Sequence, residues 1–208
     1  MTNQAERNKY THNLSTSTNS KTCSLGFVEV QYLKFTHEGN KMAIGIFYGS
    51  NGGATETVAE KIKDKLGVEA DLHDIANVDM DKFDEYTQII IGTSTWGEGE
   101  LQDDWEKCFE DFKNVDFAGK TVAFFGLGDQ DEYGENFLDA MGILHDAAVE
   151  KGANIVGNGW PTGGYDYEES TAIEDGLFVG LGIDDDNQFD LTDERVEKWV
   201  EIIKPSLT

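Results

Sequence analysis

A glycine-rich segment has the composition of a phosphate-binding loop. Residues 49–55 read Gly-Ser-Asn-Gly-Gly-Ala-Thr and run directly into a helical pattern over residues 56–66. Glycines let backbone N–H groups turn towards one point, the Ser50 and Thr55 hydroxyls add donors, and a helix N-terminus favours an anion. Residues 49–60 contain no Lys or Arg, so neutral donors alone would hold the phosphate. The alternative is a plain strand–turn–helix joint with Thr55 as the helix cap.

Two other nucleotide-binding motifs are excluded for this loop. It lacks the Gly-Lys-Ser/Thr of nucleoside-triphosphate loops and the GxGxxG of dinucleotide-binding folds. The chemistry that remains is the binding of a terminal phosphate.

Two further loops place an aromatic side chain among small and polar residues. Trp96 lies within residues 93–101, and Tyr133 lies within residues 126–136. An aromatic face at a strand end can stack on a flat heterocycle, and glycines let backbone amides approach a ligand edge. The alternatives are a Trp96 packed under its own loop and a solvated acidic loop around Tyr133.

Short apolar runs predict the strands that position these loops. The predicted strands are 43–48, 68–73, 88–93, 121–126 and 154–157. Helical patterns alternate with them over 55–66, 103–112, 137–151 and 193–203. Near-continuous apolar runs indicate strands buried on both faces, so we predict an α/β fold with a doubly wound five-stranded parallel sheet. The three loops then meet at the carboxyl ends of the strands, where such folds bind ligands.

The stretch 160–190 is too long for an ordinary connection in this fold. It contains several glycines and the acidic run 184–186. We predict a long insertion at the fifth strand, with residues 178–181 resuming the sheet.

Residues 1–41 differ from the rest of the chain. They carry a charge of +2, so residues 42–208 carry −27 of the total −25, and the first half is rich in Ser, Thr and Asn. We predict a disordered extension at 1–41 and one domain over 42–208. Three origins are open: a start assigned too early, with Met42 as the true first residue, which we favour; an organellar transit segment; or a genuine arm.

The overall composition excludes several function classes. A net charge of −25 repels nucleic acid and anionic membranes and favours basic protein patches as partners. Cys23 and Cys108 have no ligand-like spacing, and no apolar run reaches the length of a membrane span. We therefore expect no metal site and a soluble protein in a reducing compartment. His73 and His145 are isolated, and we predict a strand residue and a helix-surface residue.

Taken together, the three loops resemble those of the flavodoxin family, specifically its long-chain class. The resemblance covers residues 42–207 and rests on the loop 50–55, the segment 95–101, and residues 125–130 with Tyr133. Residues 178–188 are similar to the long-chain insertion. One departure is Gly52, where the family usually has Ser or Thr; a lost neutral hydrogen bond is worth about 1 kcal/mol.

The resemblance implies a flavin mononucleotide (FMN) site. Residues 50–55 would cradle the phosphate, Trp96 and Tyr133 would cover the two faces of the isoalloxazine ring, and backbone near Asp129 would meet its pyrimidine edge. The Gly97–Glu98 peptide would turn its carbonyl towards flavin N5 in the neutral semiquinone. The implied cofactor-binding residues are Ser50, Asn51, Gly52, Gly53, Ala54, Thr55, Thr95, Trp96, Gly97, Glu98, Gly99, Gly128, Asp129 and Tyr133.

The resemblance also implies a function. The protein would be a low-potential one-electron carrier that shuttles between semiquinone and hydroquinone, with no substrate turnover of its own. Its donor would be a basic flavoprotein or ferredoxin-type reductase, and its acceptor a redox enzyme. We expect a cytoplasmic monomer, or a plastid protein if residues 1–41 are a transit segment. The alternative is an FMN-dependent NAD(P)H:quinone reductase.

Overall fold

The structure is a computed structural model that describes residues 43–207. The extension predicted at 1–41 lies outside the described residues, so its disorder and its origin stay predictions.

A mainly parallel sheet forms the centre of the fold. Its strands are β1 (Ile44–Tyr48), β2 (Ala70–Asp74), β3 (Gln88–Trp96), β5 (Thr121–Leu127), β6 (Asn154–Ile155) and β10 (Leu181–Ile183). The order is β10-β5-β3-β1-β2, with β6 also on β5, and all these pairs are parallel. This confirms the predicted doubly wound α/β class.

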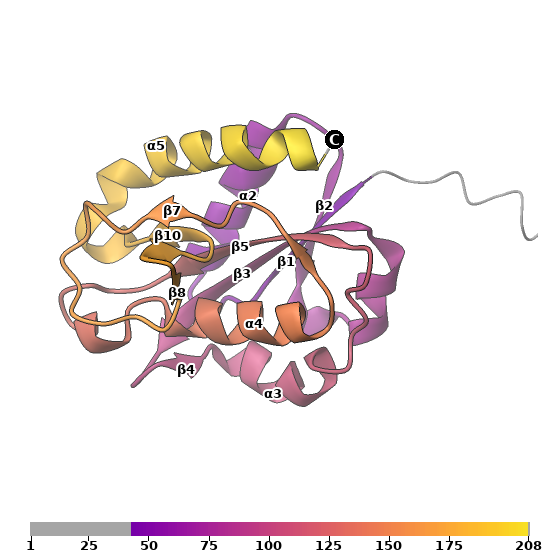
Figure 1. The fold of residues 1–208 in the computed structure, drawn as a ribbon, viewed down its shortest axis with the longest axis horizontal. Coiled ribbons are helices and arrows are strands. Elements are labelled where there is room, and N and C mark those ends of the chain that lie inside the picture. The colour runs from indigo at the N-terminus through magenta and orange to yellow at the C-terminus, as the bar shows by residue number, and fades with distance from the viewer. Residues whose placement is uncertain (1–42, 208) are drawn as a thin grey trace, which may run out of the picture. The chain divides into compact units, whose positions relative to one another are not determined.

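Helices cover both faces of the sheet. They are α2 (Ala54–Leu66), α3 (Asp103–Phe112), α4 (Asp139–Glu150) and α5 (Asp185–Ile203). Figure 1 shows α2 and α5 together on one face and α3 and α4 on the other. The short 3-10 helices are η1 (Ile75–Asn77), η2 (Met80–Glu85), η3 (Gly134–Asn136) and η4 (Lys204–Ser206). None of the helices within 43–207 is long and apolar enough to cross a membrane.

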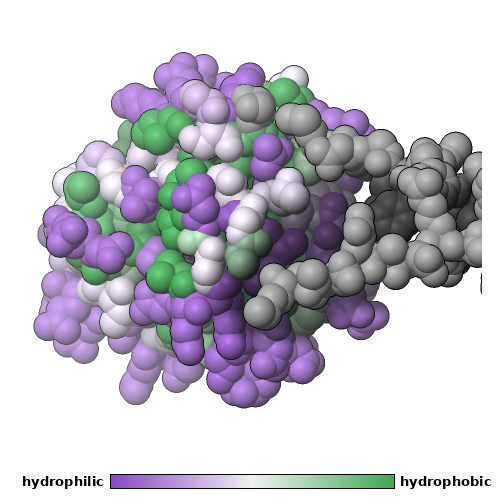
Figure 2. All heavy atoms as spheres, turned by 45° about the vertical axis from the view of Figure 1, so that its right-hand side comes forward, coloured by the Kyte–Doolittle hydropathy of each residue, from purple (hydrophilic) through white to green (hydrophobic). Residues whose placement is uncertain are grey.

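The apolar runs of the sequence form the core. All residues of β1 are buried, as are Ile89, Ile90 and Ile91 of β3 and the run 122–125 of β5. Burial on both faces explains why these strands show no alternation of apolar and polar residues. Hydrophilic residues cover much of the face shown in Figure 2, in keeping with the acidic composition.

The fifth-strand position differs from the prediction. β6 ends at Ile155 rather than at residue 157, and the edge of β5 is occupied again from Leu181. Between them lies a small antiparallel sheet of β7 (Trp160–Pro161), β9 (Leu177–Phe178) and β8 (Ile173–Glu174).

The prediction that residues 178–181 resume the main sheet was therefore wrong for residues 178–180, because the sheet resumes only at Leu181. Phe178 pairs instead with Trp160 and Ile173, and its buried ring packs against those of Phe137 and Tyr165. An aromatic cluster outside the main sheet takes this residue, and a local apolar run does not reveal that choice.

Several other boundaries also moved. β2 begins at Ala70 rather than at residue 68, and α4 begins at Asp139 rather than at residue 137 because Leu138 has a φ of 66°. β3 continues to Trp96 and pairs with an antiparallel β4 (Glu100–Leu101). α5 begins at Asp185, eight residues before the predicted 193, and is kinked at Gln188.

Candidate functional site

The three predicted loops meet around one cavity of about 280 Å³ at the carboxyl ends of the strands. Ten predicted residues line it: Ser50, Asn51, Gly52, Ala54, Thr55, Thr95, Trp96, Gly128, Asp129 and Tyr133. The predicted residues absent from its lining are Gly53, Gly97, Glu98 and Gly99. Its lining also includes residues the sequence reasoning missed: Ser94, Leu127, Asp185 and Asp186.

Only weak sequence patterns marked the four residues that were not predicted. Ser94 and Leu127 lie at strand ends next to predicted site residues, so the register of those strands could have suggested them. Asp185 and Asp186 belong to a noted acidic run, but only the early start of α5 brings them to the cavity.

The first loop leads into a helix start of the kind that favours an anion. Gly53 is the N-cap of α2 with a φ of 87°, a conformation that glycine adopts without a side-chain clash. No side chain caps this end of α2, so the reading with Thr55 as cap was wrong. The first backbone N–H groups of a helix have no partner within it, and Ala54 and Thr55 of this first turn line the cavity.

Two hydroxyls of this loop are placed to donate. Ser50 Oγ accepts a hydrogen bond of 3.0 Å from the Gly53 N–H, which leaves the hydroxyl proton available. Thr55 is only 1 % exposed and lines the cavity, yet its hydroxyl makes no hydrogen bond among the residues the structure describes. A hydroxyl that opens to the cavity and has no protein partner fits a site that a ligand completes.

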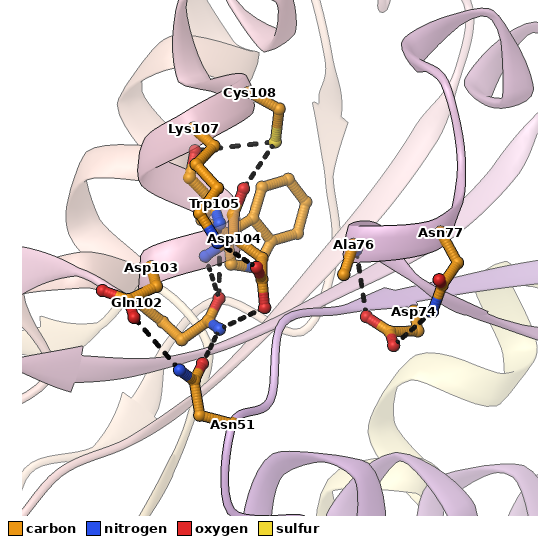
Figure 3. Close-up of polar contacts among 10 residues, drawn as sticks. All are labelled: Asn51, Asp74, Ala76, Asn77, Gln102, Asp103, Asp104, Trp105, Lys107 and Cys108. Atoms are coloured by element: carbon orange, nitrogen blue, oxygen red, sulfur yellow. Dashed lines mark hydrogen bonds and ion pairs between the residues drawn. The ribbon is translucent and has the colours of Figure 1, made fainter.

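A buried glutamine ties the first loop to α3 (Figure 3). Gln102 Nε2 donates to the Asn51 side-chain oxygen and, at 2.8 Å, to Asp104 Oδ2. Its Oε1 accepts from the Asp104 and Trp105 N–H groups and caps α3. Asn51 Nδ2 also donates to Asp103 at 3.1 Å, so the Asn51 amide is already bound within the protein. Gln102 was not predicted from the sequence, because no local pattern marks a hydrogen bond between residues 51 positions apart.

The second loop is a tight hairpin between β3 and β4. Thr95 pairs with Leu101 and Trp96 with Glu100, and the Gly99 N–H donates to the Trp96 carbonyl at 3.1 Å. Trp96 is 41 % exposed and its Nε1 donates to Ser94 Oγ at 3.0 Å. The reading in which Trp96 packs under its own loop was therefore wrong, and its ring is available at the cavity.

The third loop is held by carboxylates. Asp129 Oδ1 accepts from the Asp131 and Glu132 N–H groups, both at 2.9 Å, and from Asn187 Nδ2 at 2.8 Å. Asp184 is fully buried and accepts from the Gln130 N–H at 3.2 Å. Tyr133 is 50 % exposed and lines the cavity, so the loop is more than a solvated acidic segment.

The cavity has an acidic wall. Burial raises the pKa of Asp186, and the charges of Asp129, Asp184 and Asp185 add to this. Burial alone would raise the pKa of Asp129, but hydrogen bonds from Glu132, Asn187 and Asp131 outweigh it and lower that pKa. No Lys or Arg is among the described residues that line the cavity.

A larger cavity, of about 490 Å³, lies elsewhere. It is lined mainly by acidic residues of η2 and of the end of α3, which precede the amino ends of β3 and β5. It has no aromatic ring and no glycine loop, and the opposite edge of the sheet holds the chemically equipped site.

Other titratable groups lie outside the site. His145 is 5 % exposed, which corrects the predicted helix-surface position; its ring packs on Phe124 and its Nδ1 lies 3.0 Å from Asp146. His73 is a β2 residue, as predicted. Burial raises the pKa of Cys108 to about 11. Within residues 43–207 no group of three His, Cys, Asp or Glu side chains could hold a metal ion.

Comparison with known proteins agrees with this geometry. The family model described as Flavodoxin matches residues 46–199. A flavodoxin of Synechocystis sp. PCC 6803 is 50 % identical over 166 residues, 79 % of this chain and 97 % of that protein. Flavodoxin 1 of Escherichia coli K12 is 48 % identical over 169 residues, 80 % of this chain and 96 % of that protein.

A solved structure has the same fold. The crystal structure of Fusobacterium nucleatum flavodoxin bound to flavin mononucleotide is 33 % identical with a TM-score of 0.76, and the match covers 80 % of this chain and 99 % of that one. The match of the family model over most of the chain, together with relatives near 50 % identity, establishes the assignment. The chain belongs to the flavodoxin family.

Proposed function

We propose that the cavity at the carboxyl ends of the strands binds FMN non-covalently and that the chain carries single electrons between redox proteins. One observation carries the proposal: an uncapped helix N-terminus and two exposed aromatic side chains, Trp96 and Tyr133, line the same cavity. A phosphate and a flat heterocycle need this pair of features. The solved flavodoxin of F. nucleatum holds the same cofactor.

The phosphate is held by residues 50–55. The N–H groups of the first turn of α2 and the Ser50 and Thr55 hydroxyls would be its donors, with no contribution from a cation. The unpartnered Thr55 hydroxyl supports this placement. Asn51 acts through its backbone, because its side-chain amide is bound to Gln102 and Asp103.

The ring is held by the second and third loops. Trp96 and Tyr133 would cover its faces, with Thr95 and Gly128 beside them, and backbone groups at Asp129 would meet its pyrimidine edge. Gly97, Glu98 and Gly99, which lie outside the cavity lining, would reach the ring only from the β3–β4 turn.

Bound FMN supplies one-electron chemistry, and the chain's own residues set how it is used. The Gly97 carbonyl would accept a hydrogen bond from a protonated ring N5. Asp129, Asp185 and Asp186 resist the build-up of negative charge on the ring, because like charges nearby destabilise an anion. The chain therefore works at low potential, in the second one-electron step.

Partners are redox proteins that give and take electrons. The donor is a basic flavoprotein or ferredoxin-type reductase and the acceptor is a redox enzyme. Docking is transient and is steered by the acidic side chains around the site: Glu98, Glu100, Asp103, Asp104, Asp131 and Glu132. The chain works as a cytoplasmic monomer, in keeping with a cysteine pattern that favours a reducing compartment.

The quinone reductase alternative has less support. A nicotinamide dinucleotide carries phosphates, and the lining of the cavity within the described residues offers aspartates and no cation. Like charges would oppose its binding next to the ring.

An anaerobic dithionite titration followed by visible absorption tests the proposal. The purified protein should be yellow and should be reduced in two resolved one-electron steps. A direct two-electron reduction, with oxidation of NADPH by the protein alone, would favour the reductase alternative. A colourless protein that takes up no added FMN would refute the cofactor assignment.

A further inference from the structure

A second cavity, of about 440 Å³, lies between the small sheet and α5. In Figure 1 β7 and α5 lie next to each other, and this cavity shares no lining residue with the FMN site. Its volume falls in the range of small-molecule sites. Its walls are largely apolar and aromatic, formed by Trp160, Pro161, Tyr165, Leu191 and Ile202.

Arg195 is the polar centre of this cavity. It is 8 % exposed, and its guanidinium Cζ lies 4.0 Å from the centroid of the Tyr165 ring. Its Nη2 donates to the Gly164 carbonyl at 3.3 Å and to Gln188 Oε1 at 2.5 Å. Its Nη1 is buried and has no hydrogen-bond partner within residues 43–207.

Arg195 also lacks a counter-ion. It takes part in none of the ion pairs found among the described residues, although residues 42–208 carry a net charge of −27. A buried charge is normally paired, and leaving one unpaired is costly. The neutral acceptors bind Nη2 and leave Nη1 without an acceptor, and a carboxylate is the group that a guanidinium fork matches best.

The walls around Arg195 are fixed in place. Trp160 is buried, its Nε1 donates to Tyr165 Oη at 3.0 Å, and that hydroxyl donates to the Gly182 carbonyl at 2.6 Å. Lys198 adds a second cation whose partner, Glu194, also lines the cavity. Ile202 is an exposed apolar residue of the same lining.

We propose that this cavity binds a small aromatic carboxylate. The ring lies among Trp160, Leu191 and Ile202, and the carboxylate pairs with Arg195, with Lys198 close by. Because Nη1 is covered, the guanidinium turns slightly on binding to meet the carboxylate. This site is independent of the FMN site and of the proposed electron transfer.

Benzoate is the probe for a test by NMR on the full-length holoprotein. The indole N–H signal of Trp160 should shift with saturation, while that of the buried Trp105, which donates to the Gly92 carbonyl, stays fixed. Benzamide has the same shape without the charge and should bind at least about tenfold more weakly, as expected for loss of a charge-assisted pair. A shift at Trp96 instead of Trp160 would place benzoate in the FMN site and overturn the proposal.

Variants of the two cations show how each contributes to benzoate binding while the fold is kept. Arg195→Lys keeps a charge but loses the fork, and we expect about tenfold weaker binding. Lys198→Ala should weaken binding about threefold, whereas the matched control Lys113→Ala, which removes another exposed ion-paired lysine directly after α3, should not change it. An unchanged flavin spectrum verifies the fold of each variant.

Two outcomes of the ligand titrations also overturn the proposal. One is equal binding of benzamide and benzoate. The other is no Trp160 shift up to about 50 mM benzoate, a concentration at which even a ligand of low efficiency and this size would bind. Benzoate binding that Lys198→Ala leaves unchanged would remove Lys198 from the site, and if Arg195→Lys were also without effect, the carboxylate assignment would fail.

Discussion

At the scale of single residues, position 52 is where the phosphate loop departs from the usual family pattern. A Cβ built on Gly52 meets no atom within 4 Å, so packing does not require a glycine at this position. We predict that Gly52→Thr strengthens FMN binding about fivefold, which corresponds to about 1 kcal/mol for one added neutral hydrogen bond. Titration of the apoprotein with FMN, followed by the quenching of flavin fluorescence, measures this change.

Two controls separate the effect of the added hydroxyl on FMN affinity from other effects of the substitution. Riboflavin lacks the phosphate, so its affinity should be equal in both proteins. Gly52→Ala adds the Cβ alone; if it tightened FMN binding as much as Gly52→Thr, backbone entropy rather than a phosphate contact would be the cause.

Gly97 sits at the turn of the β3–β4 hairpin. Its φ is +52°, a conformation that costs other residues roughly 1–2 kcal/mol. We predict that Gly97→Ala hinders the hydrogen bond between the carbonyl of residue 97 and a protonated ring N5. The gap between the two one-electron potentials of the flavin should then narrow by tens of millivolts. Spectroelectrochemistry measures both potentials. Gly99→Ala, which strains the same turn at a φ of +100°, is the comparison; equal narrowing in both would mean that general hairpin strain, not the Gly97 carbonyl, sets the gap.

At the scale of elements, the sequence predicted a helix or strand correctly wherever one local pattern dominated. Continuous apolar runs correctly indicated β1, β3 and β5, and the bounds of α3 were predicted without error. Predictions failed where a distant contact decides. Phe178 joins an aromatic cluster rather than the main sheet, and the carboxylate of Asp184 starts α5 eight residues early.

The site followed the same rule. The loop 49–55, which has a local composition signal, was predicted from the sequence, and its residues 50–52, 54 and 55 line the cavity. Gln102 and Asp186 were not predicted, because their roles depend on the packing of α3 and α5. Tertiary position, not residue type, makes them part of the site.

The carboxylate of Asp184, the N-cap of α5, also holds the third loop by a hydrogen bond. Asp184 accepts from the Asn187 N–H at 3.0 Å and the Gln130 N–H at 3.2 Å, and Asn187 Nδ2 links it to Asp129. We predict that Asp184→Ala destabilises the protein by about 2 kcal/mol, through loss of a helix cap and a buried hydrogen bond. Denaturant unfolding of the apoprotein measures this without the cofactor.

The same change should loosen the loop. Hydrogen exchange at the Gln130 amide should accelerate in the Asp184→Ala apoprotein, and FMN should bind more weakly. Asp190→Ala, which removes an exposed carboxylate from the same helix, is the control and should change neither quantity. Loss of stability with unaltered exchange at Gln130 would separate the cap from the loop.

At the scale of the whole molecule, charge decides how partners meet the site. The hydrophilic surface of Figure 2 belongs to a body of net charge −27, and acidic residues surround the FMN cavity. We predict that the electron-transfer rate to a basic acceptor protein, cytochrome c, falls on the order of tenfold between about 10 and 300 mM ionic strength. The rate to the anion ferricyanide should rise over the same range. Stopped-flow kinetics of the reduced protein measures both rates.

The docking site is tested by neutralising acidic residues at two different places on the molecule. Glu98, Glu100 and Asp131 lie in the loops of the FMN site, whereas Asp79, Asp81 and Asp84 line the acidic cavity at the opposite edge of the sheet. Neutralising either trio to Gln or Asn removes three charges. Because screened attraction decays within a Debye length, only the first trio should reduce the salt dependence with cytochrome c strongly. Equal losses would mean that the total charge of the molecule steers the encounter and that the acidic residues around the flavin do not select the docking face.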